Sequence, residues 1–188
     1  VVAVVKANAY GHGAVPISKA LLAAGAHRLG VATVAEGLEL RAAGVTAPIL
    51  VLGGVFPEEI PSLLEGNLTP VLPSHETIQD MARAVAARPS PRPLQVHLKI
   101  DTGMSRLGLP PEDVLSPLGS SWPATLQVEG LMSHLARADE PEAAGLAVTR
   151  DELVAGGLGM GDVGGALQVE HRRRLHFLAA FERERGIA

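Results

Sequence analysis

The sequence predicts an α/β fold in which strands of a parallel sheet alternate with helices. Short β-branched runs recur along the chain, and each is followed by a loop and a segment of helical periodicity that ends at Gly or Pro. The runs are mostly continuous apolar stretches, which is typical of parallel strands covered on both faces. With 188 residues, of which 47% are hydrophobic, the chain can bury a sizeable core as one domain.

The strands and helices of this pattern follow in order along the chain. Helical periodicity after the first strand ends at Gly25, and Gly is favoured just past a helix. Thr33 and Glu36 have capping-box spacing and predict a helix that Gly44 ends. Pro70 weakens the fourth strand. The expected strands are 1–5, 28–32, 48–53, 68–72, 94–100 and 126–132, and the expected helices are 15–24, 34–43, 58–65, 75–87, a short one after 110, and 170–185.

Two architectures fit six such units. One is an open, doubly wound sheet, and the other is a barrel of eight strands. A complete (β/α)8 barrel takes about 250 residues, so six units would leave it two strands short, with open edges on the first and sixth strands. Periodicity alone does not decide between them.

Composition and charge argue against several classes of function. The net charge of −4 argues against a nucleic-acid or anionic-membrane surface, and the one basic run, 171–174, is interpreted as a solvated helix face. The absence of cysteine excludes disulfides. No run approaches about 20 apolar residues, so we expect no membrane span. We expect no metal site. No signal peptide is visible, although the sequence starts at Val1, already in a strand.

Polar side chains gather at the carboxyl ends of three expected strands, where α/β folds place their functional groups. The three clusters are KANAYGHG (6–13), KIDTGMSRLG (99–108) and SHLARADE (133–140). We expect them around one rim, with the side chains of Lys6, Tyr10, His12, Lys99, Asp101, Arg106, His134 and Asp139.

Lys6 is the most informative of these residues. The chain has 16 basic residues, and only Lys6, Lys19 and Lys99 are lysines. A lysine at the end of a buried strand either needs an ion pair or a snorkelling side chain, or has an amine whose pKa is depressed so that it can act as a nucleophile. Both readings stay open.

The other clusters also allow a functional and a structural reading. Tyr10 could donate to an anion or pack half-buried. Lys99 and Arg106 suggest an anionic group nearby, whereas the simpler explanation of Arg106 is a salt bridge with Asp101. His134 could contact a planar ligand or fill a structural position.

A glycine pattern further along has the spacing of a dinucleotide loop but lacks its context. GMGDVG (159–164) has no clear strand before it, and a dinucleotide loop needs one. We interpret the surrounding stretch, 141–169, as a flexible Gly-rich loop.

Three long motifs resemble one known family. AVVKANAYGHG (3–13) closely resembles the pyridoxal-phosphate (PLP) signature of bacterial alanine racemases. VHLKIDTGMSRLG (96–108) and EGLMSHLARADE (129–140) are similar to two further barrel motifs of that family, in the same order. The resemblance covers 1–140 and resumes in the expected last helix.

The resemblance implies a PLP-binding (β/α)8 barrel of TIM type, followed in the family by a β-rich C-terminal domain, in a homodimer. We therefore expect residues 1–188 to be a partial barrel domain of about six βα units, with a Gly-rich insertion at about 141–169. The family's C-terminal domain and the last two barrel strands are expected to be missing, as from a piece cut at both ends.

By the same resemblance, Lys6 matches the lysine that bonds PLP covalently and moves the Cα proton of the substrate. Tyr10 matches the tyrosine that hydrogen-bonds the PLP phosphate. Arg106 matches the arginine near the PLP phenolic oxygen and the substrate carboxylate, and Lys99 matches a lysine often carbamylated, whose negative charge would orient that arginine. His134 matches the histidine beside the cofactor ring.

The implied reaction interconverts L-alanine and D-alanine by two-base proton transfer at Cα, which supplies D-alanine for peptidoglycan in the cytoplasm. Met104 matches a residue that lines the substrate site across the dimer. The family's second base is a tyrosine of the partner's C-terminal domain, but the one tyrosine here is Tyr10. We therefore expect this chain alone to be inactive. A serine or broad-specificity racemase, and a PLP-binding barrel that does not racemise, are the alternatives.

Overall fold

The computed structural model describes residues 1–89, 92–115, 122–134, 166–170 and 177–180. Their elements, in chain order, are β1 (Val2–Val4), α1 (Lys6–Tyr10), α2 (Ala14–Ala23), β2 (Arg28–Val31), α3 (Val34–Ala42), β3 (Ile49–Val51), the 3-10 helix η1 (Pro57–Glu59), α4 (Ile60–Glu65), β4 (Thr69–Leu72), α5 (His75–Ala86), β5 (Leu94–Ile100), α6 (Pro111–Leu115), β6 (Leu126–His134), β7 (Ala166–Glu170) and β8 (Phe177–Ala180).

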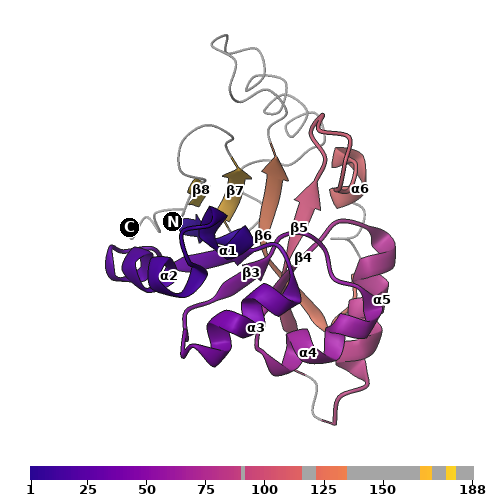
Figure 1. Ribbon diagram of the computed structural model, residues 1–188. Coiled ribbons are helices and arrows are strands. Elements are labelled where there is room, and N and C mark those ends of the chain that lie inside the picture. The colour runs from indigo at the N-terminus through magenta and orange to yellow at the C-terminus, as the bar shows by residue number, and fades with distance from the viewer. Residues whose placement is uncertain (90–91, 116–121, 135–165, 171–176, 181–188) are drawn as a thin grey trace, which may run out of the picture.

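The strands form a closed barrel in the order β1 to β8. Strands β1 to β7 pair in parallel, each with the next. In Figure 1 the arrows of β5, β6 and β7 accordingly point the same way, and helices α2 to α5 lie outside the strands. The prediction of six parallel βα units in a TIM-type barrel is confirmed, and the open, doubly wound alternative is wrong.

The expectation for the end of the chain needs correction. Residues 177–180 form strand β8, where a helix was expected over 170–185, and β8 runs antiparallel to both β1 and β7. Pairing with β8 satisfies backbone groups on β1 and β7 that would otherwise form open sheet edges. Two short strands, β7 and β8, thus close the barrel. The sequence pattern predicts only six units of strand and helix. Except for 170, the rest of the expected last helix lies outside the described residues, which leave out 171–176 and 181–188. Of the Gly-rich segment, 141–165 lies outside the described residues, and 166–169 belongs to β7.

Capping explains where two of the helices begin. The Thr33 hydroxyl accepts from the Glu36 N–H at 3.2 Å, and the Glu36 carboxylate accepts from the Thr33 N–H, so the predicted capping box is confirmed. Ser74 caps α5 in the same way through Thr77. Each bond satisfies an N–H that the first helical turn leaves without a partner.

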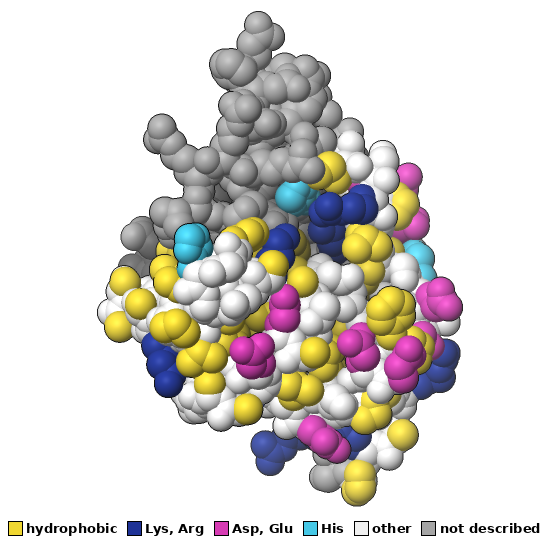
Figure 2. Space-filling model, viewed as in Figure 1, with side chains coloured by type: hydrophobic (Ala, Val, Ile, Leu, Met, Phe, Trp, Pro, Cys, Tyr) yellow, Lys and Arg dark blue, Asp and Glu magenta, His cyan; other side chains and the backbone are white. Residues whose placement is uncertain are grey.

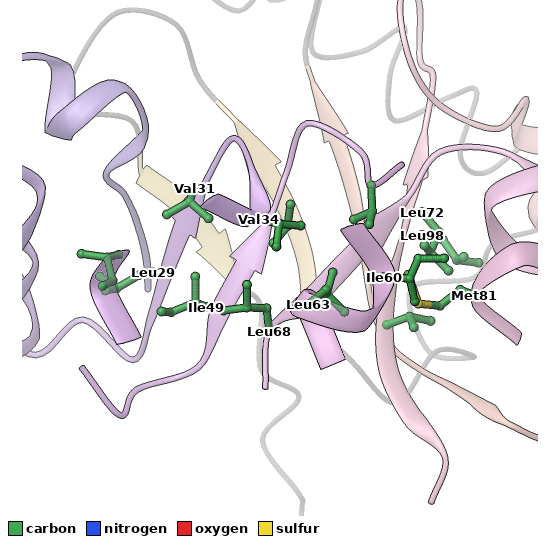
Figure 3. Close-up of a cluster of buried hydrophobic side chains, with 14 of the residues drawn as sticks. Leu29, Val31, Val34, Ile49, Ile60, Leu63, Leu68, Leu72, Met81 and Leu98 are labelled. Atoms are coloured by element: carbon green, nitrogen blue, oxygen red, sulfur yellow. The ribbon is translucent and has the colours of Figure 1, made fainter. Parts of the chain in front are cut away.

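Strands β1, β3, β4 and β6 carry buried apolar side chains on both faces, as their continuous apolar runs predicted, whereas β5 also buries His97 and Lys99. Between the strands and the helices lies a large cluster that Figure 3 shows in close-up, in which Leu29 and Ile49 come from strands and Leu63 and Met81 come from helices. Alternate strand residues form a second cluster inside the barrel, consisting of Val2, Val4, Leu50, Leu52, Val71 and Met132.

Polar side chains from three strands meet in the barrel interior. The Arg28 guanidinium on β2 makes two hydrogen bonds with the Glu129 carboxylate on β6, one of them 2.8 Å long. The ring of His97 on β5 is 2% exposed, and its Nε2 lies 3.5 Å from a Glu129 oxygen. The hydrogen bond from Arg28, followed by the contact with His97, lowers the pKa of Glu129 to about 2.

No helix among the described residues is long and apolar enough to cross a membrane.

Candidate active site

The described residues of the three polar clusters lie at the carboxyl ends of parallel strands and therefore at one rim of the barrel. Lys6 lies two residues after the end of β1 and begins α1, Lys99 is the penultimate residue of β5, and His134 ends β6. On the face shown in Figure 2, basic side chains and a histidine gather above the centre. The common rim that the sequence predicted is confirmed for these three residues. Asp139 lies outside the described residues.

The candidate residues differ in exposure. Lys99 and His134 are buried, with 4% and 6% of their surface exposed, whereas Tyr10 is 43% exposed. Lys6 and Met104 are intermediate, and His12 and Arg106 are exposed. The rim thus has a buried base formed by the ends of β5 and β6, and an accessible edge formed by the loops after β1 and β5.

Lys6 leads into a left-handed helical turn, which was not predicted. Ala7, Asn8, Ala9 and Tyr10 have φ between 51° and 55°, and Gly11 continues with a φ of 88°. Non-glycine residues in this region cost about 1–2 kcal/mol each and normally occur singly. Because such strain persists only where the surroundings hold it and is concentrated at functional sites, this turn marks the loop after β1 as a functional candidate.

Side-chain and backbone bonds hold this turn against the rest of the barrel. The Asn8 Oδ1 accepts from the Ala14 N–H at 2.7 Å, which joins the turn to the start of α2. The Ala9 N–H donates to the Val5 carbonyl at 2.9 Å, and the Gly13 N–H donates to the Asn8 carbonyl at the same distance. Asn8 was not singled out from the sequence, although Asn is among the residues that tolerate left-handed backbone best.

The loop after β5 is organised by Asp101. One oxygen of its carboxylate accepts from the N–H groups of Gly103 at 3.1 Å and Ser105 at 3.0 Å, and the other accepts from the backbone N–H of Arg106 at 3.1 Å. The Asp101–Arg106 side-chain salt bridge, one of the sequence alternatives, is not among the ion pairs of the described residues. Asp101 therefore fixes the backbone of Arg106 and leaves its guanidinium available at the rim.

The ends of β5 and β6 are also joined directly. The buried hydroxyls of Thr102 and Ser133 share a hydrogen bond, and Ser133 precedes His134. Sequence reasoning missed this bond because Thr and Ser at strand ends carry no distinctive pattern. It ties the loop of Arg106 to the strand of His134.

Comparison with known proteins identifies this arrangement. A family model described as "Alanine racemase, N-terminal domain" matches residues 1–155. The chain belongs to the alanine racemase family. It is 48% identical to the alanine racemase of Synechocystis sp. over 148 residues, an alignment that covers 76% of this chain. It is 49% identical to the alanine racemase of Symbiobacterium thermophilum over 141 residues, an alignment that covers 74% of this chain.

Solved structures agree with this family assignment. Alanine racemase from Clostridium difficile 630 superposes with a TM-score of 0.80 at 32% identity over 90% of this chain and 45% of that one. Alanine racemase from Bacillus anthracis with bound L-Ala-P gives 0.74 at 32% identity, over 90% of this chain and 44% of that one. A histidine racemase from Leuconostoc mesenteroides superposes with a TM-score of 0.79 at 30% identity, over 90% of this chain and 45% of that one.

The chain spans 38% of the Synechocystis enzyme and 37% of the Symbiobacterium enzyme. The alanine racemase barrel described here is therefore a part of what those relatives contain.

Proposed function

We propose that this chain is the cofactor-binding barrel of a PLP-dependent alanine racemase. The observation that carries the proposal is the position of Lys6, which lies just past the carboxyl end of β1 and opens the strained turn. An aldehyde cofactor needs an accessible amine, and Lys6 is partly exposed just past a strand whose residues are all buried. Membership of the alanine racemase family supports the same assignment.

The residues of the rim fit the parts of PLP. Lys6 would hold the cofactor covalently and would move a proton at the substrate Cα on one face. Tyr10, which is 43% exposed at the far end of the turn, would bind the phosphate through its hydroxyl. When bound, PLP supplies an electron sink that stabilises negative charge at Cα.

Arg106, Lys99, Met104 and His134 complete the site. Arg106 lies on the loop that Asp101 fixes, and it binds the phenolic oxygen of the cofactor and the substrate carboxylate. Lys99, buried on β5, orients Arg106 after carbamylation, which would replace its positive charge by a negative one. His134 supports the cofactor ring from the end of β6, and Met104 lines the substrate site.

We further propose that the active enzyme is a homodimer in the cytoplasm, that it takes alanine as substrate, and that it supplies D-alanine for peptidoglycan. Racemisation needs one base on each face of a planar intermediate. Lys6 serves one face, and a tyrosine from outside this chain serves the other, so the chain by itself is inactive. A racemase of broader specificity is the second candidate, because the histidine racemase shares the fold with a TM-score as high as most alanine racemases.

The test is racemisation by the full-length protein that contains this chain, supplied with PLP. Formation of D-alanine from L-alanine is expected, and Lys6→Arg should reduce it by at least about 10²-fold because a general base is lost. Lys19→Arg, the same change at another lysine, should leave it unchanged. Equal activity of Lys6→Arg and the unsubstituted protein would contradict the proposal, and comparable rates with L-serine or L-histidine would favour the second candidate.

A further inference from the structure

The left-handed turn after Lys6 needs an external restraint, since four consecutive non-glycine residues occupy a costly region of backbone space. The hydrogen bonds within the turn do not explain what fixes the orientation of its first peptide group, which joins Lys6 to Ala7. That peptide matters because it contains the carbonyl carbon of Lys6, whose position, together with those of N and Cα, fixes the direction of the Lys6 Cα–Cβ bond.

One carboxylate from a neighbouring βα unit meets this peptide. The Glu36 Oε1 accepts from the Ala7 N–H at 2.8 Å. The Glu36 Oε2 accepts from the Ala32 N–H at 2.6 Å and from the Thr33 N–H at 3.4 Å. The carboxylate thus joins the first residue after Lys6 to the loop between β2 and α3.

Capping of α3 does not explain these contacts. A capping-box glutamate needs only the bond to the N-cap N–H, which here is the bond to Thr33 and is the longest of the three. The two shorter bonds go to residues outside the capping box, and one of them crosses from α3 to the turn after β1. Hydrogen bonds to an ionised carboxylate are about twice as strong as neutral ones, so a fixed charge at this point is an effective restraint.

We propose that Glu36 is a positioning residue for Lys6: its carboxylate holds the Lys6–Ala7 peptide and so aims the Lys6 amine into the cofactor site. Glu36 acts through the backbone and does not contact substrate. The inference about the backbone stands on the contacts above, whereas its consequence for catalysis rests on the proposed function.

The experiment compares Glu36→Gln with two controls in the full-length protein. Glu36→Gln keeps the size of the side chain but turns one acceptor oxygen into an NH2 group, which cannot accept from a backbone N–H. Glu39→Gln makes the same change at an exposed position of the same helix. Thr33→Ala removes the capping hydroxyl while it leaves the Glu36 carboxylate in place.

The first readout is hydrogen exchange at the Ala7 amide, measured without regard to activity. Exchange should become about tenfold faster or more in Glu36→Gln and stay unchanged in Glu39→Gln and Thr33→Ala. The second readout is racemisation with PLP bound, for which kcat should fall about tenfold or more in Glu36→Gln with little change in KM, because the base is misdirected while the substrate contacts remain.

The outcomes separate this inference from the proposed function. If the unsubstituted protein racemises nothing, the proposed function fails, but the exchange measurement still decides the role of Glu36. Unchanged exchange at Ala7 in Glu36→Gln would overturn the inference, and so would an equal effect of Thr33→Ala, since capping would then account for it. Loss of folding in both Glu36→Gln and Glu36→Asp would also overturn it, because the carboxylate would then stabilise the whole barrel rather than the turn.

Discussion

The ion pair across the barrel interior makes stability depend on pH in a defined direction. Glu129 binds Arg28 through two hydrogen bonds, and the two side chains are 23% and 27% exposed. In Glu129→Gln the carboxylate is lost and Arg28 faces a neutral amide. We expect this substitution to destabilise the protein at neutral pH.

The magnitude follows from the pKa of Glu129. A fall from 4.5 to about 2 corresponds to about 3 kcal/mol, since one pKa unit is worth about 1.4 kcal/mol. Because about a quarter of each side chain remains exposed, solvent screening reduces this to about 2 kcal/mol. The folded-state pKa lies below the unfolded one, so this stabilisation is complete above pH 4.5 and is lost as the pH falls through about 2.

Urea unfolding of the full-length protein and of Glu129→Gln measures this difference. The substituted protein should be less stable by about 2 kcal/mol near neutral pH, and more than half of that difference should disappear by about pH 3. A matched control is Glu112→Gln, for which no such ion pair is found among the described residues. A difference that stays constant between these pH values would refute the assignment of the stabilisation to the Glu129 charge.

Two further predictions concern backbone geometry. In Gly108→Ala the new Cβ would lie 2.4 Å from the backbone nitrogen of Asp101, so the loop must shift, and we expect a fall in racemisation together with lower thermal stability. The control is Gly54→Ala, since Gly54 also has a positive φ (95°, against 145° for Gly108) but its Cβ would meet nothing within 4 Å. Equal effects of the two substitutions would contradict the steric explanation. The Arg41 guanidinium donates to four backbone carbonyls, and the ammonium group of Arg41→Lys cannot make all of these bonds. Urea unfolding should therefore show that Arg41→Lys lowers the free energy of unfolding by about 1–3 kcal/mol, whereas Arg83→Lys, at an exposed position, does not. An equally small effect of both substitutions would argue against the role of Arg41.

The local features of the fold could be predicted because they are recorded in neighbouring residues. The capping box of Thr33 and Glu36 depends on residues three apart, and it is present as expected. The six strands follow from apolar runs that are buried on both faces. Their common direction places Lys6, Lys99 and His134 at one rim, so the site could be outlined from motif positions alone.

What could not be predicted depends on contacts between distant segments. The helical periodicity at 177–180 is overridden by pairing with the edges of β1 and β7. Arg28 and Glu129 meet only because the barrel brings non-adjacent strands face to face across its interior. The left-handed turn at Ala7 is disfavoured by the sequence itself, and Glu36 restrains it from 29 positions away.

The most direct test of the central claim is to locate the covalent attachment of PLP. The full-length protein is incubated with PLP, the C=N bond is reduced with borohydride, and the modified peptide is identified by mass spectrometry. This chain offers three candidates, Lys6, Lys19 and Lys99. The account predicts modification of Lys6, with no labelling of this chain after Lys6→Arg. Labelling of Lys19 or Lys99 in preference to Lys6, or of none of the three, would contradict it.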